Sequence, residues 1–95
     1  MNLYVFCYLG LLRFPEQLEP SLALLPEGQR AEAANILASV KDLSRAELLQ
    51  RWSRLCEDER VAVHQNAYKE FGIRLDDMAP PVQAWCLSRL VDQNG

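Results

Sequence analysis

From Pro15 onward, hydrophobic side chains recur every three or four positions along the chain and never alternate cleanly with polar ones. This is the period of α-helices that pack on one another, whereas half-buried strands alternate with a period of two. The 95 residues are enough for one small domain and too few for two. The sequence therefore predicts a single all-α domain over residues 1–95, built as a small helical bundle or a short stack of helical hairpins with about five helices.

Prolines, one glycine and one capping motif set the expected boundaries of these helices. Proline fits the first turn of a helix and breaks its interior. Ser44 and Glu47 have the spacing of a capping box, and Gly72 can end a helix in the left-handed conformation. Asp76 or Asp77 is expected to cap the last helix. The expected helices cover residues 15–25, 26–40, 45–56, 57–71 and 80–91.

Apolar stripes predict which face of each helix is buried. We expect the helix over 26–40 to be the central one, because its alanines form a second face that neighbouring helices could approach closely. In the helix over 57–71, the spacing predicts a buried face made of Val61, His64, Tyr68 and Phe71. In the other helices, the expected core residues are Leu18, Leu22, Leu25, Ala33, Ile36, Leu37, Val40, Leu48, Leu49, Trp52, Leu55 and Cys56.

Residues 1–13 form an apolar segment that could be a helix or a strand. Aromatic and β-branched side chains such as Tyr4 and Val5 favour a strand, whereas Leu9 and Leu11 suit a helix. A lone strand in a helical domain has no partner for its backbone hydrogen bonds unless a second copy of the chain supplies one. We therefore expect a helix, with a dimerising strand as the alternative, followed by a helical core over residues 14–95.

The chain has more apolar surface than a domain of its size can easily hide. A chain this short buries only about 60–68% of its unfolded surface. The surplus is expected to meet another protein or a second copy of the chain, or else the opening segment threads the middle of the bundle. Aromatic anchors dominate interface energies. The expected partner-binding residues are Tyr4, Phe6, Tyr8, Leu12, Val82 and Trp85.

Charge and cysteine content narrow the class of partner and the compartment. Ten Lys and Arg residues against thirteen Asp and Glu residues give a net charge of −3, which is no footprint for nucleic acid or an anionic membrane. The apolar run from Leu3 to Leu12 is shorter than the roughly 20 residues of a membrane-spanning helix. Three cysteines at no zinc spacing indicate reduced thiols and a cytoplasmic protein without a metal or cofactor.

The sequence leaves three functional hypotheses from different classes. We expect a non-catalytic protein–protein interaction or adaptor module of a cytoplasmic assembly, with no small-molecule substrate. The first alternative is a small thiol-dependent enzyme using Cys56 or Cys86 with His64, although the acidic residues that follow Cys56 disfavour a thiolate there. The second is a helix-turn-helix nucleic-acid binder made of segments 44–56 and 57–71, whose turn lacks the usual glycine.

A short similarity at an offset of 30 residues raises the question of an internal repeat. Residues 25–33 and 55–63 share a leucine, a glutamate and an arginine at matching positions. Helical-hairpin repeats show such a period. Two unrelated helix starts would also share these residues, because helix starts favour the same residue types.

Overall fold

Six α-helices and two short 3₁₀-helices make up the fold in a computed structural model that describes the backbone of residues 2–94 and the side chains of residues 2–91. No strand occurs in this part of the chain, so the predicted all-α class is confirmed, and the number of α-helices is close to the predicted count of about five. The helices are α1 (Leu3–Arg13), α2 (Pro15–Ser21), η1 (Leu22–Leu24), α3 (Glu27–Val40), α4 (Arg45–Ser53), α5 (Glu57–Phe71), η2 (Leu75–Asp77) and α6 (Pro80–Asn94).

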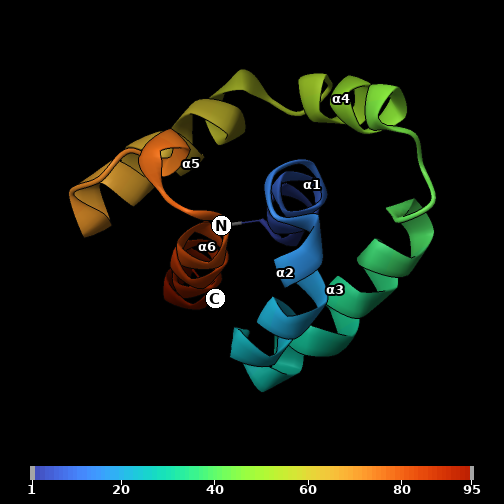
Figure 1. The fold of residues 1–95 in the computed structure, drawn as a ribbon, viewed down its shortest axis with the longest axis horizontal. Coiled ribbons are helices and arrows are strands. Elements are labelled where there is room, and N and C mark those ends of the chain that lie inside the picture. Colours follow the sequence, from blue (N-terminus) through green and yellow to red (C-terminus); the bar gives the residue numbers. More distant parts are fainter. Residues whose placement is uncertain (1, 95) are drawn as a thin grey trace.

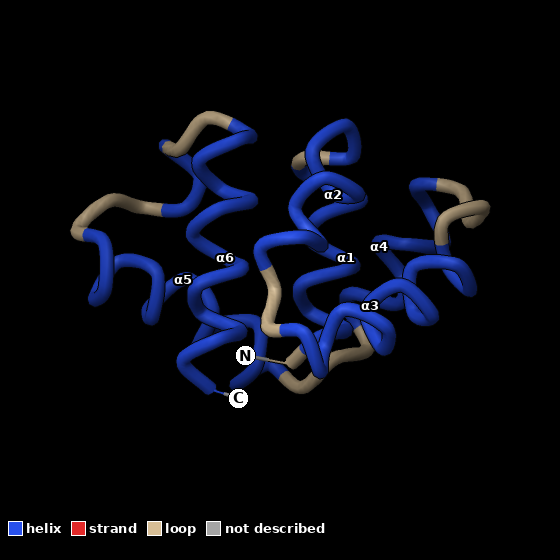
Figure 2. The backbone as a smooth tube through the Cα atoms, turned by 90° about the horizontal axis from the view of Figure 1, so that it is seen from below, coloured by secondary structure: helices blue, strands red, loops and turns tan. Residues whose placement is uncertain are grey.

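Helix α1 lies at the centre of the bundle. Figure 1 looks almost along its axis and shows the other helices arranged around it. It packs against α2, α3, α4 and α6, and Figure 2 shows α1, α2 and α6 side by side. The prediction that α3 is central is wrong, since its alanine face (Ala31, Ala34 and Ala38) is exposed on the rim. The longer apolar side chains of α1 fill space on all sides, which alanines could not do.

The opening segment is a helix, and most of its side chains are inside the molecule. Phe6 is fully buried and meets Phe14 edge-on, with ring centroids 6.2 Å apart. Tyr8 is buried as well, in a cluster with Val40 of α3 and Leu48 of α4. The expectation that Phe6 and Tyr8 face a partner is therefore wrong for this fold, because α1 threads the bundle.

Close packing of α2 on α1 depends on a glycine. A Cβ atom built on Gly10 would lie 2.5 Å from Cδ1 of Leu18, which is fully buried. Any larger residue at this position would push α2 away from α1 or force Leu18 into another rotamer. Gly10 thus lets the short α2 lie directly on the central helix.

Two of the caps that the sequence predicts are present. The Ser44 hydroxyl accepts a hydrogen bond from the backbone N–H of Glu47 at 3.2 Å. Gly72 adopts a φ of 72°, and its N–H donates to the Tyr68 carbonyl at 2.8 Å. Asp76 does not cap α6 as expected but pairs with Arg13.

Two predicted helices are shorter than expected and one is longer. The α-helix that begins at Pro15 ends at Ser21, one residue after Pro20, and continues as η1. Pro20 supplies no N–H to the carbonyl four residues before it, which weakens this short helix. Helix α4 ends at Ser53 because α5 already begins at Glu57 and needs the extended backbone of Cys56 before it. Helix α6 runs to Asn94, beyond the expected end at residue 91.

Helix α5 buries a different face from the predicted one. Val63 and Ala67 are its buried residues, whereas Val61 and Tyr68 are exposed. The observed face is thus rotated by about one residue, or roughly 100°. Val63 and Ala67 join the main core cluster, which also contains Leu90 of α6. A small alanine lets α5 approach that core more closely than the tyrosine beside it could.

On α4, only Leu48 of the predicted face is buried. Trp52 and Leu55 are half-buried, and Leu49 and Cys56 are exposed. Leu22, an expected core residue of the helix predicted over residues 15–25, is also half-buried. The remaining predicted core residues of α2 and α3 and their connection are buried: Leu18, Leu25, Ala33, Ile36, Leu37 and Val40.

The two similar segments are both helix starts. Helix α3 begins at Glu27 and α5 at Glu57, each preceded by an N-cap residue with nearly the same extended backbone. In the first segment, Nε of Arg30 reaches back to the carbonyl of Leu25 at 2.8 Å. In the second, no hydrogen-bond partner within the described residues is recorded for Nε of Arg60. The two segments thus share the extended backbone before a helix start, but their arginines differ in hydrogen bonding.

Candidate binding surface on α5 and α6

The six predicted partner-binding residues do not form one surface. Tyr4 is 47% exposed and contacts Tyr8 edge-on, with ring centroids 6.1 Å apart. Because Tyr8 packs toward α3 and α4, Tyr4 lies on that side of α1. Leu12 is half-buried against the same cluster. The structure separates these residues from Val82 and Trp85 on α6.

The second group lies on an exposed face of α6. Val82 is 46% exposed and Trp85 is 47% exposed. Together with Arg89, they follow the spacing of three and four residues that places side chains on one side of a helix. We call these three residues and Phe71 of α5 the Trp85 face.

The Trp85 ring is held in place from two sides. Phe71 meets it in a tilted arrangement, with ring centroids 5.8 Å apart. The guanidinium carbon of Arg89 lies 5.7 Å from the centroid of the indole ring, within the range of a cation–π interaction. The indole is therefore ordered although nearly half of it is exposed.

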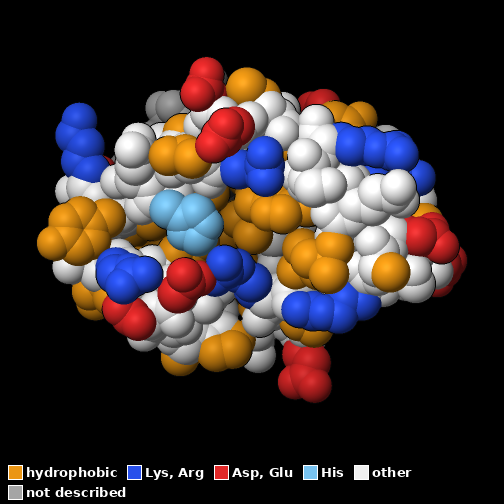
Figure 3. All heavy atoms as spheres, turned by 90° about the horizontal axis from the view of Figure 1, so that it is seen from above, with side chains coloured by type: hydrophobic (Ala, Val, Ile, Leu, Met, Phe, Trp, Pro, Cys, Tyr) orange, Lys and Arg blue, Asp and Glu red, His pale blue; other side chains and the backbone are white. Residues whose placement is uncertain are grey.

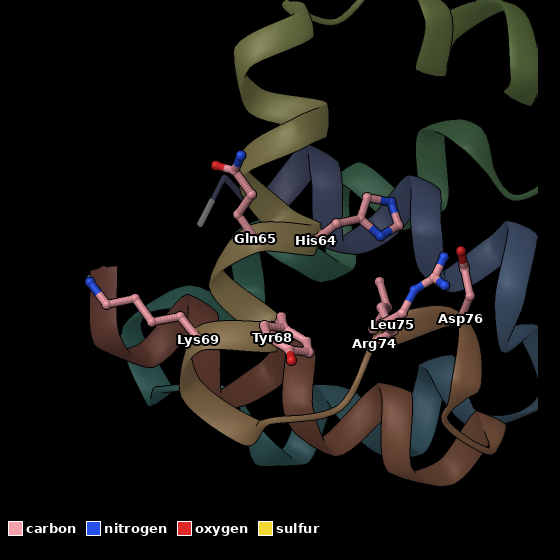
Figure 4. Close-up of a pocket in the computed structure, with 7 residues that line it drawn as sticks. All are labelled: His64, Gln65, Tyr68, Lys69, Arg74, Leu75 and Asp76. Carbon is pink, nitrogen blue, oxygen red and sulfur yellow. The ribbon is translucent and has the colours of Figure 1, made fainter.

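A groove opens where α5 leads into η2. It encloses about 570 Å³, and we call it the His64 groove. Figure 4 shows the side chains of His64, Arg74 and Asp76 directed toward one another, whereas Gln65 and Lys69 extend to the opposite side. Figure 3 shows the histidine at the surface among hydrophobic side chains and charges of both signs. The lining residues are His64, Gln65, Tyr68, Lys69, Arg74, Leu75 and Asp76.

Three charged side chains, Arg13, Arg74 and Asp76, surround His64 at the end of the groove. Arg13, at the end of α1, donates a hydrogen bond to the carboxylate of Asp76, and this bond holds the pKa of Asp76 below its usual range. Partial burial lowers the pKa of His64, and the positive charges of Arg13 and Arg74 lower it further while Asp76 opposes them. The neutral form of the imidazole therefore predominates at pH 7. The Asp76 carboxylate accepts a hydrogen bond from Arg13, and Arg74 lies close enough to influence both His64 and Asp76.

The groove and the Trp85 face are joined by the last turns of α5. Tyr68 is 59% exposed and lines the groove. Phe71 follows it by three residues on the same helix and touches Trp85. Sequence reasoning assigned Tyr68 and Phe71 to a buried face and did not single out Arg74 or Arg89. Only the rotation of α5 and the return of the chain through η2 bring these side chains to one region.

The cysteines lie outside this region. Burial raises the pKa of the Cys7 thiol to about 11, and its sulfur donates to the carbonyl of Ala33 at 3.6 Å. Cys86 is buried too, and burial raises its pKa. Cys56 is exposed at the N-terminus of α5, but eight residues of helix place it roughly 12 Å along the axis from His64. No cysteine lines the groove into which His64 opens.

Neither metal ligands nor a helix-turn-helix emerge from the described part of the chain. Within it, no group of three or more His, Cys, Asp or Glu side chains converges as metal ligands would. Helix α4 packs on α1, whereas α5 packs on α6 and η2. Figure 1 shows α4 and α5 following one another around the rim rather than packing as a two-helix unit. None of the described helices combines the length and apolar character needed to cross a bilayer.

The side chains of this region indicate what kind of surface it can bind. No protein-family profile, curated protein sequence or solved structure matches the chain. The region offers an ordered indole, a phenol ring, two guanidinium groups and a neutral imidazole. These groups suit recognition of a surface with apolar and anionic parts.

Proposed function

We propose that this chain is a non-catalytic protein–protein interaction module that binds its partner through the Trp85 face. The observation that carries the proposal is the half-exposed Trp85 held between Phe71 and Arg89. Tryptophan and arginine are the side chains most enriched among the residues that dominate interface energies. A ring that is already ordered loses little conformational entropy on binding.

A different protein suits this face better than a second copy of the chain. In a two-fold symmetric contact, the same patch meets itself. Such a contact would bring the Arg89 guanidinium groups of both copies into one interface, and the Trp85 face includes no carboxylate to compensate for their charge. We therefore infer a heterologous partner and an adaptor role.

The side chains of the His64 groove and the state of the cysteines support binding rather than catalysis. The His64 groove is lined by no cysteine, serine or threonine that could act as a nucleophile beside the imidazole. All three cysteines are free, which suits the reducing environment of the cytoplasm. We infer a cytoplasmic assembly as the setting.

The proposal can be tested with two aliphatic residues of nearly equal exposure. Val82 lies on the Trp85 face, and Leu49 lies on α4, with 46% and 45% of their surfaces exposed. A photo-cross-linking amino acid placed at position 82 in cells should capture a partner that the same amino acid at position 49 does not capture. With the purified partner, Val82→Asp should weaken binding about tenfold or more, corresponding to about 1.4 kcal/mol.

Leu49→Asp is the matched control and should change the affinity less than about twofold. Equal effects of both substitutions, or capture only at position 49, would place the interface elsewhere and overturn the proposal. Circular dichroism of both variants checks that they retain the fold.

A further inference from the structure

We propose that the partner presents an acidic segment whose carboxylate binds Arg74 in the His64 groove. This inference rests on the proposed function, because it names the chemistry of the partner that contacts the Trp85 face. It assigns a second contact point, about one helical turn of α5 away from the first.

The balance of charges in the groove argues for an anion. Asp76 is the one acidic residue among the lining side chains, and it accepts its hydrogen bond from Arg13. No ion pair of Arg74 is recorded within the described part of the chain. Arg74 nevertheless lies near enough to affect both His64 and Asp76. A planar guanidinium with free donors binds a carboxylate through two parallel hydrogen bonds.

The shape of the groove suits a side chain rather than a flat surface. Its volume of about 570 Å³ falls within the range of small-ligand pockets. Tyr68 and Leu75 contribute apolar surface beside the charged end. The neutral imidazole of His64 can donate one hydrogen bond to a carboxylate without adding a charge. These features fit an Asp or Glu side chain flanked by an apolar residue.

Specificity for an acidic segment would come from the difference in charge between the groove and the chain as a whole. The net charge of −3 gives the chain as a whole no general attraction for an acidic segment. Among the side chains that line the groove, Lys69 and Arg74 outnumber Asp76, whose carboxylate already accepts a hydrogen bond from Arg13, so the groove itself attracts an acidic segment. A segment lying along the end of α5 would place an apolar side chain on Trp85 and an acidic one beside Arg74.

The test is a titration of the full ¹⁵N-labelled chain with two synthetic peptides, followed by nuclear magnetic resonance. One peptide alternates Glu and Leu, and the other has Gln in place of every Glu. The Glu peptide should bind about tenfold more tightly at low salt and shift the Nε–H resonance of Arg74. Arg74→Gln should abolish the preference for Glu. Arg51→Gln, at an exposed position on α4, is the control and should preserve it.

The outcomes separate this inference from the proposed function. If both peptides bind equally and shift the Trp85 indole N–H, the acidic-segment inference is wrong and the Trp85 face remains a binding surface. If the Glu peptide shifts Arg74 but leaves Trp85 unmoved, the groove binds carboxylates and the proposed function loses support. Absence of any shift overturns the inference, as does concentration-dependent self-association of the chain that Arg74→Gln removes, which would make a second copy the occupant.

Discussion

Arg13, the last residue of the central helix, donates a hydrogen bond to the carboxylate of Asp76, which lies 63 positions later in the sequence. The side chains are only partly exposed, at 29% for Arg13 and 50% for Asp76. This pair links the most buried helix to the loop that forms one wall of the groove. The position of Arg74 and the electrostatics around His64 therefore depend on where α1 lies in the bundle.

The pKa of His64 should report on this arrangement. Arg13 lowers it and Asp76 raises it. Arg13→Gln removes a positive charge and frees the carboxylate, so the pKa should rise. Asp76→Asn removes the carboxylate and frees the arginine, so the pKa should fall. Because His64 is the only histidine, its ring resonances can be followed without ambiguity in a pH titration. Shifts in the reverse directions would contradict the geometry described for the groove.

The same imidazole should make stability depend on pH. Its pKa in the folded chain lies below the ordinary value of 6.5, so the unfolded chain binds a proton more readily. Stability should be fully present above about pH 6.5 and should decrease as the pH falls toward the pKa of the folded state. The urea midpoint measured at pH 7.5 and pH 5.0 tests this. His64→Gln should reduce the difference between the two midpoints, and an unchanged difference would show that His64 does not titrate differently on folding.

Thiol labelling separates the interaction module from a thiol-dependent enzyme. In the native protein at pH 8, one thiol should react quickly with a disulfide reagent, and Cys56→Ser should remove that reaction. Cys7 and Cys86 should react only when the chain unfolds, because both are buried and burial raises their pKa. Rapid labelling of Cys86 well below pH 8 would revive the hypothesis of a thiolate paired with His64.

The central position of α1 can be tested with two aromatic residues two positions apart. Phe6 is fully buried, whereas Tyr4 is 47% exposed. Phe6→Ala should lower the free energy of unfolding by about 3–5 kcal/mol through the cavity it leaves. Tyr4→Ala should cost about 1 kcal/mol or less. Urea denaturation of both variants measures the difference, and small equal effects would mean that α1 does not form the core.

Much of the fold follows from local chemistry. The five helices predicted from Pro15 onward begin within one residue of their predicted positions, since prolines and the Ser44 cap act on the backbone nearby. The Gly72 turn ends α5 at the predicted residue. The face of α5 does not follow from such rules. Periodicity favours the large side chains of Val61 and Tyr68, whereas packing selects the close approach that Ala67 permits.

The residues of the proposed binding surface can be predicted from the sequence only in part, for the same reason. Val82 and Trp85 could be chosen because their helix has apolar residues on more than one side. Phe6 and Tyr8 lie in an apolar, aromatic segment of the kind that forms interfaces. Only the packing of the other helices around α1 places these two side chains inside the protein. Arg74 carries no local signal, since its role depends on Arg13 reaching Asp76 from another helix.

The indole N–H resonances of the two tryptophans provide the most direct test of the proposed interaction. Trp85 lies on the α6 face, and Trp52 lies half-buried on α4 as an internal control. When the ¹⁵N-labelled chain is saturated with the partner captured at position 82, the Trp85 resonance should shift and the Trp52 resonance should stay in place. A shift of Trp52 with Trp85 unmoved would contradict the account and put the interface on the opposite side of the bundle.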